Sequence, residues 1–591
     1  MPVTVDPGVA AIPTPERDDW YAPDEHARWL VRRSVGEAVW PVAGAALAEA
    51  GRLVPRTVEP LARTADRNPP VLRQYDGRGE RVDELDFHPA YTELERTVLG
   101  SGAVRMAHTS GWRGLPGCAP RPLTTALLYL FLQADQAVTG CPVGMMDAMC
   151  RALRRNDPGL AARFVPRIAD DSGNHLTGAM FLTEKVGGSD VGSNQSRAVR
   201  ESDGSWRLWG EKWFCSCPHS DLVLVTARPE GAAPGTAGLG LFLMPRRLDD
   251  GSRNSYVLHR LKEKFGTRAM PSAEVGLRGA FAWQVGGLDR GMRQMLDMVN
   301  LTRVGITAAA AGSMRRSAFE ALSHAHARQT FGRRLDAHPL MADTLAELVT
   351  DATAGLTAAL GAAKLLDRAD AGDGEAAAAL RLLTPLLKGL LTERARVSAT
   401  EAMEVRGGNG FIEDWPEPRL LRDVYVHAIW EGSSNVMALD GMRALARGAG
   451  SGYLADTERR LEGAGGAATP LAALLLSRLR DITVDLETLT ATDGVDARQL
   501  RVRRLSRRMA TLAIAARLTE QAAEHAADTG SGRLLWLAVR YASRLAPSGA
   551  RDTLLDDPGW LAHAEPLLHG GPVPLTVGTT AAAILADASV G

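Results

Sequence analysis

One stretch of the chain has the residue spacing of a long helix with a single apolar face. Its apolar residues are Leu345, Leu348, Val349, Ala352, Leu356, Ala359, Leu360 and Ala363. Steps of three and four residues bring side chains to one side of an α-helix, and such a face must be covered by other elements. The stretch therefore predicts a long helix inside a helical bundle.

The residue pattern changes twice along the chain. Ala126 to Val138 is typical of an apolar helix, whereas Trp206 to Gly210, Leu222 to Thr226 and Leu239 to Met244 are short β-rich runs separated by turn residues. We therefore expect an α+β chain that is mostly α. Its expected parts are a disordered or extended lead-in (1–25), an N-terminal α domain (26–178), a middle antiparallel β domain (179–288), a C-terminal four-helix bundle (289–448) and a helical extension (449–591).

Charge and cysteine usage narrow the classes of function. The formal net charge is −1, so nothing global indicates a nucleic-acid or membrane partner. The five cysteines, Cys118, Cys141, Cys150, Cys215 and Cys217, are scattered, which favours neither a disulfide framework nor a metal site. No signal peptide is recognisable, and no apolar run reaches about 18 residues. We therefore expect a cytoplasmic protein without a metal.

Two segments combine glycine or glutamate with residues suited to a ligand. In Leu182 to Asp190, two adjacent glycines and Ser189 let backbone N–H groups approach a phosphate or a flavin edge, although an ordinary β-turn explains the segment equally well. In Ile429 to Asn435, burial beside Trp430 would raise the pKa of Glu431, as suits a base. In isolation, that segment favours a helix boundary with an exposed glutamate.

Two further segments pair arginine with glycine. Arg328 to Gly332 and Arg406 to Gly410 each begin with an arginine, which suits a pyrophosphate, and glycine pairs such as Gly407 and Gly408 admit a ligand against bare backbone. Taken alone, each segment is more often a loop with a solvated arginine.

Together, these segments resemble the acyl-CoA dehydrogenase family. The family motifs T-E-x-x-x-G-S-D, K-W, R-x-x-F-G, G-G-x-G-[FY] and aromatic-E-G-[ST] occur here in order, within a similarity that spans about residues 70 to 448. The T-E-K-x-G-G-S-D form, the tryptophan before the glutamate and the helical extension resemble the AidB-like branch, as do Asn68 to Pro70 and Phe87 to Ala90. The resemblance implies the acyl-CoA dehydrogenase fold.

The resemblance also implies FAD, bound between the β domain and the bundle. It implies that Arg328 and Phe331 reach the adenosine diphosphate half from a partner subunit, so that the protein is a homodimer or a dimer of dimers (a homotetramer). The remaining cofactor-lining residues that it implies are Leu182, Thr183, Gly188, Ser189, Phe214, Cys215, Ser216, Gly407, Gly408, Ile429, Trp430, Gly432, Ser433 and Asn435.

The family reaction is α,β-dehydrogenation of an acyl thioester, an oxidoreduction of a CH–CH group. The resemblance makes Glu431 the base and Arg303 a substrate residue, with an electron-transfer flavoprotein or oxygen as acceptor. Three departures are Cys215 at the expected threonine position, Asn300 where the family has aspartate three residues before Arg303, and the bulky Trp430. They favour a small, unusual or carrier-bound acyl group over ordinary fatty acyl-CoA.

Two alternatives follow from other features. The AidB-like branch is linked to DNA binding in the alkylation response, and Arg501, Arg504 and Arg508 would share one helix face. A solvated face paired with acidic residues is the preferred interpretation of these arginines. A flavin monooxygenase or oxidase on the same fold is a lesser alternative, because such relatives tend to lack the glutamate.

Overall fold

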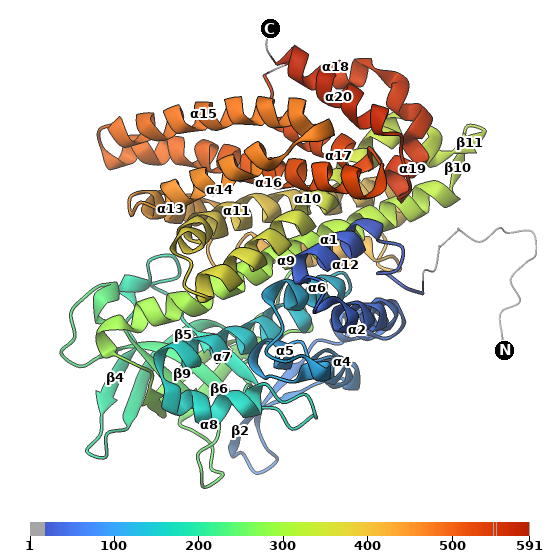
Figure 1. Cartoon of the computed structure of the whole chain (residues 1–591). Coiled ribbons are helices and arrows are strands. Elements are labelled where there is room, and N and C mark those ends of the chain that lie inside the picture. The colour runs from blue at the N-terminus through green and yellow to red at the C-terminus, as the bar shows by residue number, and fades with distance from the viewer. Residues whose placement is uncertain (1–17, 548, 551, 590–591) are drawn as a thin grey trace, which may run out of the picture.

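A computed structural model describes residues 18–547, 549–550 and 552–589. The β-rich region lies below the long central helices, and the C-terminal helices form a layer above them (Figure 1). The family fold expected from the sequence is confirmed. Most of the expected lead-in, residues 1–17, lies outside the described residues, but Trp20 and Tyr21 are buried against the core.

The N-terminal part is helical and carries one small hairpin. Its elements are α1 Glu25–Val35, α2 Trp40–Leu53, α3 Glu59–Arg67, β1 Val71–Tyr75, β2 Arg81–Asp86, α4 Pro89–Gly100, α5 Arg105–His108, α6 Arg121–Phe131, α7 Gly144–Asn156 and α8 Pro158–Ile168. The expected helix from Ala126 to Val138 ends instead at Phe131. The Asp135 carboxylate then accepts the backbone N–H groups of Ala137 and Val138 at 3.0 and 3.2 Å, which starts a new turn.

The middle part is a sheet that closes on itself. Its strands are β3 Gly178–Phe181, β4 Arg197–Arg200, β5 Trp206–Ser216, β6 Leu222–Pro229, β7 Gly240–Pro245, β8 Tyr256–Leu261 and β9 Ser272–Gln284. The order β6-β4-β5-β9-β7 returns to β6, while β3 and β8 add to β6 and β9. Most pairings are antiparallel, as expected, but β6 pairs in parallel with β3 and β4.

Three long helices form the centre of the molecule. They are α9 Gly291–Ala327, α10 Pro339–Asp370 and α11 Gly374–Arg406, followed by the shorter α12 Glu417–His427 and α13 Ser434–Leu445. All eight apolar residues from Leu345 to Ala363 that predicted a bundle helix are buried in α10. A two-strand hairpin, β10 Gln329–Thr330 and β11 Arg333–Arg334, projects beyond the end of α9 (Figure 1).

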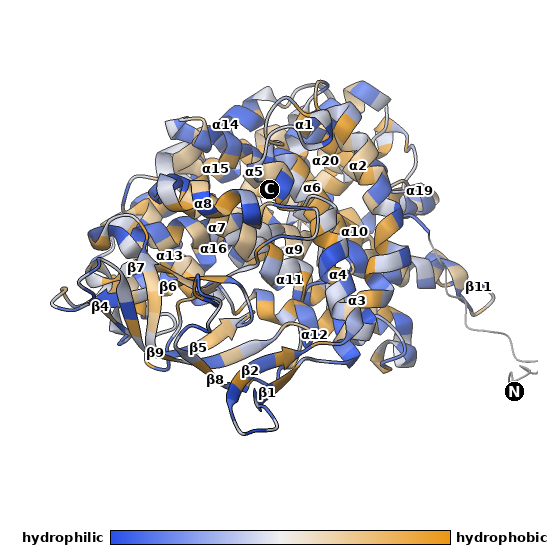
Figure 2. Ribbon diagram, turned by 90° about the horizontal axis from the view of Figure 1, so that it is seen from below, coloured by the Kyte–Doolittle hydropathy of each residue, from blue (hydrophilic) through white to orange (hydrophobic). Residues whose placement is uncertain are grey.

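The C-terminal extension shares a hydrophobic core with the bundle. Its helices are α14 Gly450–Gly463, α15 Thr469–Ala491, α16 Val495–Thr529, α17 Arg533–Ala542, α18 Asp552–Asp556, α19 Ala564–His569 and α20 Leu575–Ala588. Buried residues of α10, α11, α16 and α17 belong to one cluster, so the extension covers the bundle. Hydrophilic residues occupy peripheral loops such as the β1–β2 turn (Figure 2).

Acidic and amide side chains pair with or accept hydrogen bonds from three arginines of α16. Arg507 pairs with Glu393 and Arg508 with Asp485, while Arg503 donates to the Asn435 side chain at 3.1 Å. Of the face formed by Arg501, Arg504 and Arg508, Arg508 has an acidic partner, whereas Arg501 and Arg504 are exposed. None of the helices in the described ranges is both long and apolar enough to cross a lipid bilayer.

Candidate functional site

A buried ion pair braces the glycine turn after β3. The Glu184 carboxylate accepts from Lys212 Nζ at 2.7 Å and from the backbone N–H of Gln195 at 2.6 Å. Burial alone would raise the pKa of Glu184, but the Lys212 ammonium holds it below its usual range. Leu182 and Thr183 stay half-buried, while Gly188 and Ser189 are exposed at the turn. The pair therefore holds the turn from inside and leaves its outer edge accessible.

Strand β5 runs beside this turn. Of its three residues expected to line the cofactor, two have side chains on the open side of the strand. The backbone N–H of Trp213 donates to the Thr183 carbonyl at 2.9 Å. Side chains alternate along a strand, so Phe214 is 60% exposed and Ser216 half-buried, whereas Cys215 is 1% exposed and faces the core. The Cys215 side chain, expected to flank a ligand, therefore faces the core, and Ser216 supplies the accessible polar group on the open side.

Glu431 lies in a strained turn between α12 and α13. Its φ is +56° and that of the following Gly432 is +102°; such a conformation costs a non-glycine residue about 1–3 kcal/mol. Two cations hold this turn: Arg303 Nε donates to the Glu431 carbonyl at 3.0 Å, and Lys388 Nζ donates to the Gly432 carbonyl. The backbone of this turn is thus held by residues of α9 and α11.

The Glu431 carboxyl meets groups from three regions of the chain. Burial raises its pKa, while Arg303, Lys388 and a hydrogen bond with Thr302 of α9 oppose that rise, and the net direction is upward. Burial and then the charge of Glu431 raise the pKa of the Cys141 thiol to about 12, and Cys141 also hydrogen-bonds Ser216. The N-terminal domain, β5 and the bundle therefore converge at Glu431.

Asp440 replaces the acid that the sequence lacks at Asn300. Arg303 NH1 lies 2.9 Å from Asp440 Oδ2 and 3.3 Å from Asn300 Oδ1. Asp440 also accepts from Arg381 at 2.6 Å. The Arg303 guanidinium, expected to contact substrate, is therefore buried and bonded to protein groups that include the Glu431 carbonyl.

An open cavity adjoins this anchor. Its volume is about 590 Å³, and its lining includes the start of α9, Arg381, Asp440 and Arg447. Arg290 and Arg293 add two more cationic groups at the start of α9. Because Asp289, Asp297 and Asp440 also line it, the cavity has a formal charge of only +1, and Asp440 connects it to Arg303 and hence to the turn that carries Glu431.

The remaining residues of the base turn have different environments. Ile429, Ser433 and Asn435 are exposed, and the Asn435 side chain accepts from Arg503. The Trp430 ring packs beside His427, with ring centroids 5.2 Å apart, and against the core. Its indole N–H is buried without a hydrogen-bond partner among the described residues. Such a group is stabilised if a bound ligand supplies an acceptor.

The R-x-x-F-G hairpin lies far from Glu431 in the same chain. From Arg303 to the end of α9 at Ala327 the helix extends about 36 Å at 1.5 Å per residue. Phe331, at the tip, has a φ of +49° and is 99% exposed, and Arg328 is also exposed. The structure therefore does not bring Arg328 and Phe331 to the base of their own chain.

The R-G-G-N-G segment lies at the hairpin end of the bundle. Arg406 is buried and pairs with Glu417 and with Glu320 near the end of α9, so it is not available for a pyrophosphate. Gly407 and Gly408 are exposed, and a side-chain carbon added to either would meet no atom within 4 Å. Only the two glycines of this segment therefore offer an open surface.

Sequence reasoning missed Lys388, Asp440 and Thr302. Lys388 had a usable signal, because a single lysine within the apolar run from Leu386 to Leu391 is rarely buried without a role. Asp440 and Thr302 have no such signal, since their importance arises from contacts with residues of other segments.

Comparison with known proteins finds three family domains in order along the chain. The adaptive response protein AidB N-terminal domain matches residues 12–173, the acyl-CoA dehydrogenase middle domain matches 179–280, and the acyl-CoA dehydrogenase C-terminal domain matches 289–446. AidB of Escherichia coli (strain K12) is 36% identical over 400 residues, which cover 66% of this chain and 72% of AidB.

Two solved structures extend the comparison. Caenorhabditis elegans ACDH-11 in complex with C11-CoA matches with a TM-score of 0.84 and 28% identity, over 91% of this chain and 93% of that chain. Glutaryl-CoA dehydrogenase from Mycobacterium smegmatis in complex with FADH2 matches with a TM-score of 0.56 and 21% identity, over 72% of this chain and 98% of that chain. The second likeness concerns the fold alone.

Proposed function

The chain belongs to the acyl-CoA dehydrogenase family, in its AidB-like branch, and from this we propose that it is an FAD-dependent enzyme that dehydrogenates an acyl thioester with Glu431 as base. The observation that carries the proposal is the convergence at Glu431. A carboxyl with a raised pKa lies in a strained turn held by two cations, near Cys141, which hydrogen-bonds Ser216 at the end of β5. A base of this kind suits removal of a proton next to a carbonyl.

The residues around this junction fit a flavin. Leu182, Thr183, Gly188 and Ser189 would line its edge beside Phe214, and Ser216 would donate a hydrogen bond. The unpartnered Trp430 indole N–H supports a ligand acceptor nearby. The other proposed contacts of the base turn are Ile429, Gly432, Ser433 and Asn435. The family resemblance and the FADH2 complex of a relative with the same fold support FAD as that flavin.

The adenosine diphosphate half would require a second subunit. Arg328 and Phe331 lie on an exposed hairpin far from Glu431 of their own chain, and Gly407 and Gly408 are open at the same end of the bundle. We propose that the hairpin of one subunit contacts the cofactor of its partner, in a homodimer or a dimer of dimers.

In the proposed reaction, Glu431 removes the proton from the carbon next to the thioester carbonyl. The Glu431 backbone N–H has no acceptor among the described residues, so it can donate to that carbonyl and stabilise the developing negative charge. FAD, when bound, supplies the acceptor for the hydride from the neighbouring carbon. Arg303 and Lys388 keep the carboxyl and the N–H aimed at the same thioester.

We propose the substrate class from the cavity beside Asp440. Arg381 pairs there with Asp440 and Arg290 with Asp289, while Arg293 and Arg447 add positive charge that favours a phosphate-bearing thioester such as acyl-CoA or a phosphopantetheine carrier. Because Trp430 packs beside His427 and the core, its bulk is not in itself an argument for a short acyl chain. The C11-CoA complex of ACDH-11 makes medium chains worth testing beside small and carrier-bound groups.

We expect the purified protein to be yellow with bound FAD, and one acyl thioester of a panel to bleach the flavin in the absence of oxygen. The panel covers short, medium and C11 acyl-CoA together with carrier-bound groups, and free CoA is the control. Electron-transfer flavoprotein and oxygen are then compared as acceptors of the reduced enzyme. A protein that stays colourless after incubation with FAD would contradict the proposal.

A second expectation concerns Lys388, which positions Glu431 and lowers its pKa. Burial lowers the pKa of Lys388 itself to about 7. Lys388→Met removes the cation, so the pKa of Glu431 rises further. The limb of the kcat/KM profile that increases with pH should therefore move to higher pH.

The control for that substitution is Lys364→Met on the neighbouring helix α10, because Lys364 is exposed. The pH profile is measured on both variants with the same substrate. If the ascending limb does not move in Lys388→Met while the flavin stays bound, Lys388 does not lower the pKa of the base.

A further inference from the structure

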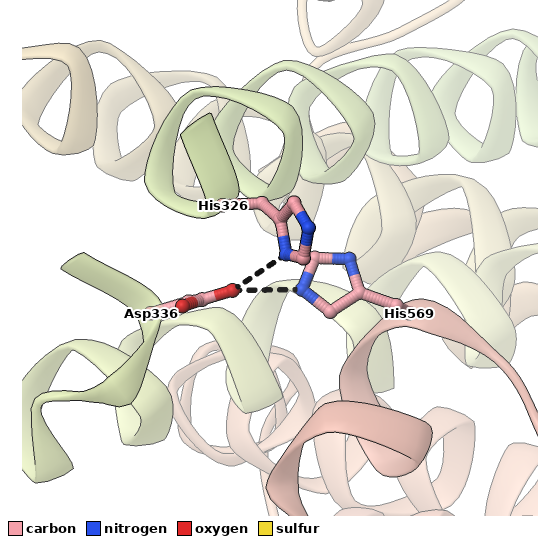
Figure 3. A group of neighbouring side chains, drawn as sticks. All are labelled: His326, Asp336 and His569. Carbon is pink, nitrogen blue, oxygen red and sulfur yellow. Dashed lines mark hydrogen bonds and ion pairs between the residues drawn. The ribbon is translucent and has the colours of Figure 1, made fainter. Parts of the chain in front are cut away.

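A second constellation of polar groups lies outside the proposed active site. His326 at the end of α9, Asp336 in the following 3-10 turn, and His569 at the end of α19 have ligand atoms that all lie within 4.8 Å of one another. His326 Nδ1 is 3.0 Å and His569 Nε2 is 3.1 Å from the same oxygen, Oδ2 of Asp336. Both imidazoles point toward this carboxylate (Figure 3).

Arg334 orients the Asp336 carboxylate and partly neutralises its charge. Arg334 Nε donates to the other oxygen, Asp336 Oδ1, at 3.0 Å and so leaves Oδ2 to the two histidines. Arg334 also pairs with Glu565 of α19 at 3.2 Å. With neutral imidazoles, Asp336, Glu565 and Arg334 leave this group of residues with a local charge of −1, which attracts a cation.

We propose that His326, Asp336 and His569 form a site for a nitrogen-preferring divalent cation of the Zn²⁺ class. Two imidazole nitrogens and one carboxylate oxygen are a common three-ligand set for Zn²⁺, with a fourth position left to water. Tetrahedral Zn²⁺ with bonds of about 2.0–2.1 Å places its ligand atoms about 3.3 Å apart. The two N–O distances need to open by only a few tenths of an ångström, while the nitrogens draw together.

The ligand chemistry also narrows the choice of ion. Mg²⁺ and Ca²⁺ prefer sites built from oxygen atoms, whereas imidazole suits Zn²⁺ and its late first-row neighbours. Asp336 is buried, and its second oxygen is fixed by Arg334, as the outer partners of metal ligands commonly are. The site is therefore partly organised before an ion enters.

The position of the site suggests what a bound ion does. His326 precedes Arg328 of the projecting hairpin by two residues, whereas His569 belongs to the C-terminal extension. An ion held by both would fasten the extension to the base of the hairpin. This inference does not require the proposed dehydrogenase activity, because it concerns metal binding and the stability of the folded chain.

The test is titration of the full-length, metal-stripped protein with ZnCl2 alone, followed by calorimetry. We expect one equivalent to bind to each chain and to raise Tm, since an ion that binds only the folded state stabilises it. The variants His326→Ala and His569→Ala should weaken binding by at least about 10- to 100-fold, the loss that removal of even an outer-shell partner causes. His326 is exposed, so its replacement carries little risk to folding.

Three controls make the titration specific. His563→Ala removes another histidine from the same segment but outside the cluster, and it should bind Zn²⁺ like the unsubstituted protein. Every variant carries Cys118→Ser, which removes an exposed thiol as a competing ligand for Zn²⁺. MgCl2 should produce no shift in Tm. The absence of Zn²⁺ binding, or equal affinity in His326→Ala, His569→Ala and the parent, would overturn the inference, and neither result bears on FAD.

Discussion

Glu431→Gln is expected to retain FAD but to slow substrate-dependent bleaching of the flavin by about 10³-fold, within the range for loss of a general base. Glutamine preserves the size of the side chain and leaves the backbone contacts with Arg303 and Lys388 intact, so the turn should keep its conformation. The measurement is stopped-flow absorbance under anaerobic conditions with the substrate that the acyl thioester panel identifies. Only proton removal should change, because the carboxamide cannot accept the proton.

Glu487→Gln is the matched control, since it is the same substitution at an exposed position of α15 that is not among the residues of the proposed site. In the unsubstituted protein, kcat/KM should rise with pH through the raised pKa of Glu431 and fall at lower pH, because only the deprotonated carboxyl is a base. A Glu431→Gln variant that bleaches at the normal rate would assign proton removal to another group.

Glu59→Gln is expected to destabilise the folded protein by about 3 kcal/mol at neutral pH, the lower end of the range for breaking a buried ion pair. Glu59 of α3 accepts from Arg316 of α9 at 3.0 Å and from Arg419 of α12 at 2.7 Å. Its removal leaves Arg419 without its carboxylate, whereas Arg316 keeps Glu320. The midpoint of urea unfolding measures the loss.

The loss of stability in Glu59→Gln should depend on pH. Burial alone would raise the pKa of Glu59, but Arg316 and Arg419 lower it to about 2, below its unfolded value of 4.5. The stabilisation is therefore complete above pH 4.5 and lost as the pH falls toward 2. The difference between Glu59→Gln and the parent should shrink over that interval.

The matched control for this substitution is Glu49→Gln. Glu49 pairs with Arg113 at 2.8 Å in a solvent-exposed contact, and such pairs contribute at most about 1 kcal/mol. If Glu59→Gln and Glu49→Gln unfold at the same urea concentration, the buried cluster does not hold the N-terminal helices to the bundle.

The spacing of apolar residues predicted helices and strands best where the same spacing continues along a segment. The apolar face from Leu345 to Ala363 became part of α10, and the three β-rich runs became β5, β6 and β7. The segment from Ala126 to Val138 is mostly apolar and is typical of one helix, so its pattern did not reveal that Asp135 would begin a new turn after Phe131. A single polar side chain bound to local backbone outweighed the pattern there.

The motifs predicted the candidate site less completely. Strand alternation decided that Ser216 and not Cys215 faces the open side, and the burial of Arg406 against Glu320 and Glu417 removed it from the proposed phosphate contacts. Lys388 and Asp440 were absent from the motif because the residues they support, Glu431 and Arg303, are distant in sequence. Short motifs specify the residues of a site but not the side chains that hold them.

By itself, the amino-acid sequence determined the order of helical and β-rich parts, the family, and the identity of the glutamate, because spacing and short-range residue types encode these properties. Tertiary structure alone decided which groups surround that glutamate and how they change its pKa, since burial and charge depend on three regions meeting at one point. The same reason applies to His326, Asp336 and His569, because His569 lies 233 residues after Asp336 in the sequence and only the fold brings them together.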